Sequence, residues 1–302
     1  MMKFSIIGYG AVGRPFALGL IKSGAICAGI GLRADDPDRD QAEIDNLPIS
    51  QIEDVPLDID LLVIAVPDNS VKNISDSIAE NHKSRKHINT RITNEQNPPV
   101  ALHFAGRFGL SPLEQLSESG FKCLAWHPIQ TFVKNVDPGR FRGIYAGITA
   151  DENAWEMAVD IAERLGTIPL RVSEKDRNRY HNACVLVSNY LPLLMDLAAS
   201  RLDGILDSRE DAVKALLPLV QGMVENLGAG LPENAMTGPV ARNELEAVHA
   251  HLLDWNDPSG RLVYLVLTRS LVDLAERYGR LTKDQAIKWQ KELDRIETEN
   301  HG

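Results

Sequence analysis

The sequence predicts an α/β fold, in which an N-terminal Rossmann domain with a doubly wound sheet is followed by an all-helical C-terminal domain. Three observations predict it. The chain opens with a short apolar run at residues 3–7 that leads into a glycine-rich pattern. Further apolar runs alternate with stretches of helical spacing up to residue 172, and after about residue 173 only helical spacing remains. Strands that alternate with helices are typical of a parallel sheet covered on both faces.

The strands of the predicted sheet come from continuous apolar runs, which parallel strands need because both of their faces are buried. In chain order these runs are residues 3–7, 26–32, 59–66, 100–104, 122–126, 144–148 and 168–172. Helical spacing predicts connecting helices at residues 11–22, 70–80, 112–117 and 154–165. The polar and basic stretch 81–99 interrupts the alternation, and it predicts an exposed excursion that is either a solvated insertion or a functional loop.

The pattern assigns residues 1–172 to the Rossmann domain and residues 173–302 to the helical domain. Helices are expected at residues 175–199, 209–226, 241–253, 263–278 and 284–299. The most apolar stretch, residues 183–199, contains Pro192 and Asp196, so it is expected to be a buried helix and not a membrane span. Pro192 removes the N–H that would bond the carbonyl of Ser188, which predicts a kink.

Composition narrows the class of protein. The 302 residues are 44% hydrophobic and 25% charged, which is ordinary for a soluble globular chain. The formal net charge of −10 disfavours broad binding to nucleic acid or to an anionic membrane. Cys27, Cys123 and Cys184 lie far apart without metal-ligand spacing, so no metal site and no disulfide framework are expected. Together with the lack of a signal peptide, this favours a cytoplasmic protein.

The glycine pattern GYGAVG at residues 8–13 matches the dinucleotide-binding fingerprint, and it follows a strand and opens a helix. Gly8 permits the tight turn, Gly10 lets a pyrophosphate approach the backbone, and Gly13 lets the helix pack close to the strand. The phosphates would bind the free N–H groups at the positive end of the helix. The expected cofactor-binding residues of this turn are Gly8, Tyr9, Gly10, Ala11, Val12 and Gly13.

The end of the second strand distinguishes NADP from NAD. Arg33 stands near the discriminating position and favours NADP, whereas Asp35 would support NAD if the strand ended two residues later. Pro67 and Asp68 follow the strand at residues 59–66, at the edge of the sheet where ligands bind. Asp68 is expected either to line the cofactor site or to cap the following helix.

Five segments of the chain resemble a known family in the same order. They are GYGAVG at 8–13, AVPD at 65–68, LAWHPIQTF at 124–132, YHNACVLVSNYL at 180–191 and MTGPVARNE at 236–244. The chain resembles, essentially end to end, the Rossmann-like plus DUF2520 family, whose members are labelled as NADP oxidoreductases. That family has no established reaction to carry over to this chain.

More distantly, the layout is similar to the 6-phosphogluconate-dehydrogenase-like superfamily, which includes prephenate dehydrogenase and pyrroline-5-carboxylate reductase. The resemblance implies a substrate site between the two domains and a homodimer formed through the helical domain. The β-hydroxyacid dehydrogenases carry a catalytic lysine followed four residues later by asparagine. Lys175 is here followed by Arg179, so that role is not transferred. The helix of His181 and the His127-Pro128 pair are closer to prephenate dehydrogenase, although the rest of its substrate-reading pattern is absent.

Histidines are the expected proton donors or acceptors, because a hydride transfer needs such a group near neutral pH. His127 ends a predicted strand, and His181 shares one face of a helix with Ser188. His127, His181, Ser188 and Asn189 are therefore the expected catalytic residues. His103, which ends another strand, and the cations Arg107 and Arg242 are the expected substrate-binding residues, and Arg242 is as compatible with a surface ion pair.

These residues predict an NADP(H)-dependent oxidoreductase, with NAD as the other cofactor possible. It would transfer hydride to or from a small, anionic carbonyl or imine compound. The alternative is a non-catalytic NADP(H) sensor, since a Rossmann fold does not dictate chemistry. A small-molecule substrate and a second copy of the chain are the expected partners, and neither nucleic acid nor a membrane is expected.

Overall fold

A computed structural model of the chain describes residues 1–88 and 98–298. It divides into two compact units, Met1–Tyr190 and Leu191–Gly302. The first unit contains a mostly parallel α/β sheet, and the second is helical, so the predicted fold class is confirmed. Residues 173–190, which the sequence pattern assigned to the helical half, group with the first unit.

The first unit is built on one eight-stranded sheet with the order β3-β2-β1-β4-β5-β6-β7-β8. Its strands are β1 (Lys3–Ile7), β2 (Ile26–Gly31), β3 (Ile49–Ser50), β4 (Leu61–Ile64), β5 (Val100–His103), β6 (Lys122–Pro128), β7 (Tyr145–Ala150) and β8 (Ile168–Arg171). All neighbouring strands are parallel except β6 and β7. The strand order reverses between β1 and β4, as in dinucleotide-binding Rossmann sheets.

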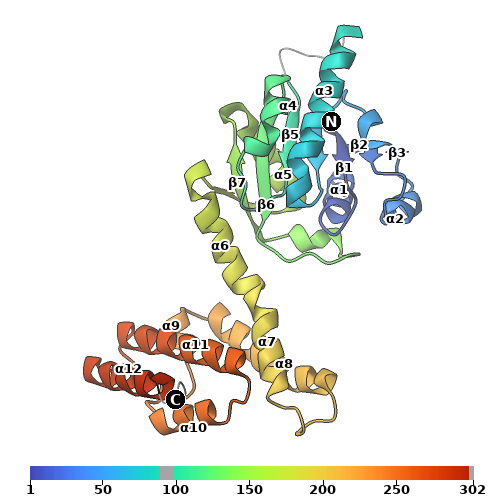
Figure 1. The fold of residues 1–302 in the computed structure, drawn as a ribbon. Helices are drawn as coiled ribbons and strands as arrows, with labels where there is room; N and C mark the ends of the chain where they lie inside the picture. The colour runs from blue at the N-terminus through green and yellow to red at the C-terminus, as the bar shows by residue number, and fades with distance from the viewer. Residues whose placement is uncertain (89–97, 299–302) are drawn as a thin grey trace. The chain divides into compact units, whose positions relative to one another are not determined.

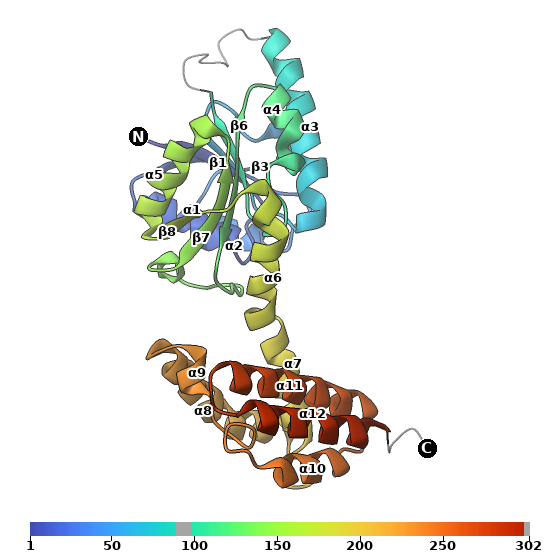
Figure 2. The ribbon, with the colours of Figure 1, turned by 90° about the vertical axis from the view of Figure 1, so that its left-hand side faces the viewer.

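Helices cover both faces of this sheet (Figure 1). On one face lie α1 (Gly13–Lys22) and α5 (Trp155–Leu165), whose Phe16, Leu20 and Ile161 belong to the same buried cluster as the strands. On the other lie α3 (Asp68–Ile88) and α4 (Glu114–Glu118), and the short α2 (Arg39–Ile44) follows β2. Figure 2 shows the helices on either side of the strands.

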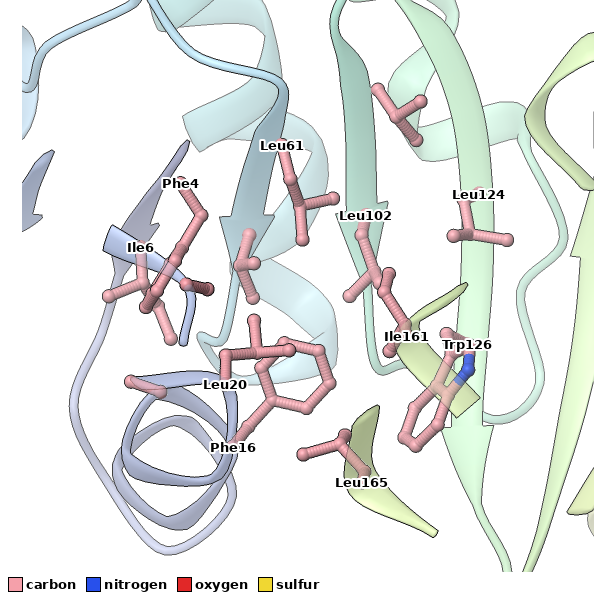
Figure 3. Packing of buried hydrophobic residues seen from close by; sticks show 14 of the residues in the cluster. Phe4, Ile6, Phe16, Leu20, Leu61, Leu102, Leu124, Trp126, Ile161 and Leu165 are labelled. Carbon is pink, nitrogen blue, oxygen red and sulfur yellow. The ribbon is translucent and has the colours of Figure 1, made fainter. Parts of the chain in front are cut away.

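The two cores follow from the period of two along each strand. In β4, Leu61 and Val63 face the first cluster, whereas Leu62 and Ile64 face the second. The ring of Phe16 packs edge-on against Trp126, with 5.6 Å between the ring centroids. Figure 3 shows this packing around Phe16. Burial on both faces explains why central strands such as β4 and β5 read as continuous apolar runs, whereas the edge strand β8 is exposed.

Helix α3 is longer than the sequence pattern predicted. It continues from Asp68 to Ile88. The prediction of an exposed excursion that begins at residue 81 is therefore wrong for residues 81–88. These residues contain no glycine or proline to end the helix, and His82 is buried against Phe121, with 5.2 Å between ring centroids. The rest of the expected excursion up to residue 97 lies outside the described residues.

The second unit is a set of helices around its own core. The helices are α7 (Tyr190–Ser200), α8 (Arg209–Gly228), α9 (Pro232–Ala235), α10 (Leu245–Leu253), α11 (Pro258–Arg277) and α12 (Lys283–Thr298). Buried residues such as Val248, Leu265 and Leu293 come from α10, α11 and α12. The indole N–H of Trp289 in α12 donates to Asn243 Oδ1 at 2.9 Å, which ties that helix to the turn before α10.

The segment around Asn189 is broken but exposed. Helix α6 (Arg177–Ser188) ends at Asn189, three residues before Pro192, and α7 begins at Tyr190. Among the described residues, one stretch, Glu174–Ser200, is long and apolar enough to cross a membrane by length and composition. Only 6% of its most apolar window is buried, so the expectation of a buried helix is wrong within a single chain.

Candidate functional site

A cavity of about 660 Å³ lies in the first unit at the carboxyl ends of β1, β2 and β4, beside the reversal of strand order. Open α/β sheets bind their ligands at this place, and the volume suits a small molecule. The lining comprises mainly residues that follow β1, β2, β4 and β6. Among them are residues 8–12, 36–38 and 65–68, with Arg33, Phe104, His127, Gln130 and Phe132.

The turn after β1 has the geometry that its glycines predict. Gly8 has a φ of +88°, and a Cβ there would lie 2.3 Å from the carbonyl oxygen of Ala65. A Cβ at Gly13 would lie 2.5 Å from the carbonyl oxygen of Gly8 and 2.9 Å from the Ala65 Cβ. Only glycine fits either position, because the obstacles are a backbone and a neighbouring strand. Helix α1 is thereby brought directly against the end of β4.

The start of α1 offers main-chain donors to this cavity. The helix begins at Gly13 without a side-chain cap and without an acidic residue in its first turn. The first N–H groups of a helix have no partner within it, and its N-terminus carries partial positive charge. The turn therefore fits the diphosphate of a dinucleotide. Ala11 and Val12, expected to bind the cofactor, line the cavity as well.

The side chain of Tyr9 is buried and anchors this turn. It is 2% exposed, and its hydroxyl donates to Asp45 Oδ2 at 2.8 Å. Arg14 in α1 binds both oxygens of the same carboxylate, at 2.8 and 3.0 Å. These bonds to Arg14 and Tyr9 hold the pKa of Asp45 below its usual range despite its partial burial. The Tyr9 side chain thus fixes the turn to the residue after α2.

Residues after β2 and β4 complete the cofactor end of the cavity. Arg33 lies two residues beyond the end of β2, is exposed, and lines the cavity together with Asp36. Asp35, the residue that would have supported NAD, is exposed and is not among the lining residues. Pro67 and Asp68 also line the cavity, and Asp68 is the first residue of α3.

His127 stands at the other end of the same cavity, near the end of β6. Its Nδ1 lies 2.7 Å from the hydroxyl of Tyr180, which also lies 3.1 Å from the carbonyl oxygen of His127. A carbonyl can only accept, so both contacts are hydrogen bonds when Tyr180 donates to it and Nδ1–H donates to Tyr180. This arrangement leaves Nε2 of His127 as a proton acceptor.

Burial is the main cause that lowers the pKa of His127 to about 4, and the neighbouring His181 and Arg177 add to it. The imidazole is therefore neutral at pH 7. The ring of His181 lies edge-on to it, with 6.0 Å between centroids. A Cβ at Gly106 would lie 2.5 Å from His181 Cδ2 and 2.8 Å from His127 Nε2. The missing side chain at Gly106 therefore lets the loop after β5 pack closely against both imidazole rings.

Arg177 lies beneath this cluster as a buried cation. It is 1% exposed, and its guanidinium donates to Thr149 Oγ1 at 2.7 Å and to the carbonyl oxygens of Ala125 at 2.8 Å and Gly106 at 3.4 Å. No ion pair involving Arg177 occurs within residues 1–88 and 98–298. The side chain fastens the start of α6 to β6, β7 and the loop after β5.

Tyr180 and Arg177 also belong to the site, although neither was predicted from the sequence. Both lie in the first turns of the helix whose His181 was singled out. A signal was present, since a large polar ring and a cation flank the histidine at helical spacing. Their partners, however, are 28 to 71 residues away in the chain. Periodicity could not reveal those contacts.

His103 ends β5, as expected, but its side chain does not line the cavity. It is fully buried; its Nε2 donates to the carbonyl oxygen of Gly109 at 2.7 Å, and its Nδ1 accepts from the Ala105 N–H at 3.1 Å. Burial lowers its pKa to about 4. With both ring nitrogens bonded to the backbone, His103 shapes the loop that carries Gly106, and nothing in its placement supports substrate binding.

The remaining predicted site residues, Ser188, Asn189, Arg107 and Arg242, do not line the cavity. The hydroxyl of Ser188 lies within hydrogen-bond distance of the carbonyl oxygen of Cys184, at 2.8 Å, and of Asn189 Oδ1, at 2.7 Å, and neither Ser188 nor Asn189 lines the cavity. Arg107 is exposed over the ring of Phe108, 4.3 Å from its centroid. Arg242 belongs to the second unit and forms two hydrogen bonds with Glu244, at 2.7 and 2.9 Å. In the described part of the chain, no group of three metal-ligating side chains is gathered.

The fold and the glycine turn define a Rossmann protein of the dinucleotide-binding class. The family model of the acetohydroxy acid isomeroreductase NADPH-binding domain matches residues 1–91, and that of DUF2520, a domain of unknown function, matches residues 144–271. The chain thus combines an N-terminal domain of the NADPH-binding type with DUF2520. The resemblance expected from the sequence is confirmed.

Solved structures with this fold include several reductases. A Bacteroides fragilis protein assigned as an NADP oxidoreductase is 21% identical, with a TM-score of 0.70 over 89% of this chain and 97% of that one. Pyrroline carboxylate reductase from Plasmodium falciparum, solved with NADP bound, is 15% identical, with a TM-score of 0.53 over 98% of each chain. An imine reductase from Streptomyces aurantiacus is 14% identical, with a TM-score of 0.54 over 95% of this chain and 99% of that one. These similarities establish the fold.

Proposed function

We propose that this protein is an NADP(H)-dependent oxidoreductase that transfers hydride to or from a small, anionic carbonyl or imine compound. The observation that carries the proposal is that residues 8–12 of the glycine turn and the neutral imidazole of His127 line one cavity. A bound nicotinamide cofactor would supply or accept the hydride. The similarity of the fold to an imine reductase and to pyrroline carboxylate reductase supports the substrate class.

His127 Nε2 is the proposed proton-exchanging atom. In the oxidation direction it accepts the proton of the substrate hydroxyl or amine, and in the reduction direction the same atom returns it. Tyr180 is a positioning residue, because its hydroxyl holds Nδ1 and so fixes which nitrogen is free. His181, beside Gly106, is the proposed route for the proton to solvent. The buried guanidinium of Arg177 does not line the cavity, but its charge has no ion-pair partner in the described residues and acts on His127, so its field favours an anionic substrate.

Arg33 supports NADP over NAD. Its guanidinium is exposed at the rim of the cavity, where it is free to pair with a 2′-phosphate, and the N-terminal match is to an NADPH-binding domain. Asp36 lies at the same rim, and acidic side chains there bind the ribose hydroxyls of NAD. The preference therefore rests on Arg33.

Turnover with purified protein tests the function. NADPH oxidation should proceed with at least one of a panel of 2-oxo acids and cyclic imines, and NADP reduction with the matching hydroxy acids or amines. His127→Ala should lower kcat by about 100- to 10,000-fold, because it removes the proton-exchanging atom, with NADPH affinity changed less than about twofold. His251→Ala is the control, since that histidine belongs to the second unit and bonds Tyr264.

Two results would oppose this proposal. Full turnover by His127→Ala would remove His127 from the reaction. NADPH binding without turnover on any panel member, together with a silent His127→Ala, would favour the sensor alternative.

We further propose a homodimer formed through the helical unit. Large apolar side chains are exposed on α7, α8 and α11: Leu191, Leu193, Leu194, Leu217, Leu219, Met223, Val224, Leu227, Leu262, Val266, Leu267 and Leu271. Exposed apolar area of this extent is typical of an interaction surface. It is spread over three helices, which favours a second copy of the chain over a single membrane span, as does the break at Asn189.

Light scattering tests the dimer. The wild-type chain should have twice the chain mass, and Leu219→Glu should shift it to the monomer, because a charge would be buried in the interface. Ile205→Glu is a matched control, since both side chains are 72% exposed and Ile205 lies outside these helices. A monomeric wild-type protein would refute the dimer.

A further inference from the structure

The carboxylate of Asp38 occupies the space in which the cofactor's diphosphate is expected. A Cβ built on Gly10 would point to the same place, and it would lie 3.2 Å from Asp38 Oδ2. Gly10 is the position of the fingerprint whose missing side chain lets the pyrophosphate approach the backbone. An acidic oxygen therefore stands over the turn, where the positive end of α1 attracts an anion.

Lys134 forms an ion pair with this carboxylate. It belongs to the segment that follows β6, and its Nζ lies 2.8 Å from Asp38 Oδ1. Lys134, Asp38 and Gly10 together line a second, smaller cavity of about 210 Å³ next to the first. The pair therefore joins the segment after β6 to the segment after β2, beside the phosphate-binding turn.

We propose that Lys134 is a cofactor-binding residue that exchanges its ion pair with Asp38 for one with the cofactor's pyrophosphate. The inference rests on the proposed function, since it takes the bound ligand to be a dinucleotide. Asp38 and a pyrophosphate are both anionic and claim the same space, so they cannot occupy it together. Binding must move the carboxylate away, which releases the Lys134 ammonium beside the new anion.

The surroundings of Lys134 keep the free-energy cost of exchanging this ion pair small. The Lys134 side chain is 63% exposed, and an ion pair at such a site contributes little to stability. The neighbouring Arg14 is already bound by Asp45 through two hydrogen bonds, so Lys134 is the available cation beside Gly10 in the second cavity's lining. The Asp38 N–H donates to Asp36 Oδ1 at 3.1 Å, which holds the backbone while the side chain turns.

The placement also predicts selectivity. Lys134 lies at the diphosphate, which NADPH and NADH share, whereas Arg33 lies at the proposed site of the 2′-phosphate, which only NADPH has. Lys134→Ala should thus lower the affinity for NADPH and for NADH by a similar factor of about 5 to 20. Asp38→Asn, which removes the competing charge, should tighten both by about three- to tenfold. Arg33→Ala should weaken NADPH alone.

Calorimetric titration of NADPH and NADH into the full-length chain and these variants tests the inference, with circular dichroism as the check on folding. Lys22→Ala is the matched control, because it removes an exposed lysine from the far end of α1. Unchanged affinities in Lys134→Ala would overturn the inference while leaving the proposed function intact. A Lys134→Ala variant that loses affinity for NADPH but not for NADH would overturn the inference as well, since Lys134 would then bind the 2′-phosphate. A wild-type chain that binds neither cofactor would sink the proposed function itself.

Discussion

Gly13→Val is expected to lower the affinity for NADPH by about 100-fold or more while the chain remains folded. The new side chain would begin 2.5 Å from the carbonyl oxygen of Gly8 and 2.9 Å from the Ala65 Cβ. Neither obstacle can rotate away, so α1 must move off the end of β4. Its free N–H groups then leave the place where the diphosphate binds. Overpacking of this kind costs about 1–3 kcal/mol of folding free energy.

Calorimetry measures this loss, and thermal unfolding separates it from a general loss of structure. Gly222→Ala is the control, because a Cβ at that position in α8 meets no atom within 4 Å. It should bind NADPH as the wild type does and be slightly more stable, since alanine favours helix. Wild-type affinity in a folded Gly13→Val would mean that the ligand does not bind on this turn.

Arg177→Ala is expected to have the largest effect on stability, a loss of about 3–5 kcal/mol in the free energy of unfolding. The substitution removes the N–H groups that donate to the buried carbonyl oxygens of Ala125 and Gly106, and it leaves a cavity among three chain segments. For a unit of this size the unfolding temperature should fall by about 10 °C. Urea unfolding at pH 7 measures the change.

Arg179→Ala, on the same helix, is the matched control for this prediction. Its side chain is 83% exposed and pairs with Asp176, so its removal should cost about 0.2–1 kcal/mol. Arg177→Met should fill part of the space and also remove a charge that lowers the pKa of His127. The His127 imidazole should therefore titrate at higher pH than in the wild type by NMR. Equal stability of the two alanine variants would contradict the assigned role of Arg177.

The parts of the fold that follow from local pattern were predictable. The glycine spacing at Gly8 and Gly13 led to the correct turn, because the pattern lies within six neighbouring residues, although Ala65, which helps to require both glycines, follows β4. Continuous apolar runs located every strand except the two-residue β3, since burial on both faces removes polar residues from the central strands. The antiparallel pairing of β6 with β7 was not predictable in this way, because the direction of a strand leaves no mark on its own sequence.

The candidate site was predictable only where it follows a strand. His127 was found from its place after an apolar run, whereas His103, at the same kind of position, bonds the backbone with both ring nitrogens. Tyr180 and Lys134 depend on partners 53 and 96 residues away. Such contacts arise when the sheet brings distant segments together, so one sequence without its fold does not reveal them.

Calorimetric titration of NADPH into the folded wild-type chain tests the central claim most directly. Saturable binding of one cofactor per chain is the predicted result, and the Gly13→Val variant should lose it. A wild-type chain that shows an intact circular dichroism spectrum and no heat of binding with either NADPH or NADH would contradict the account.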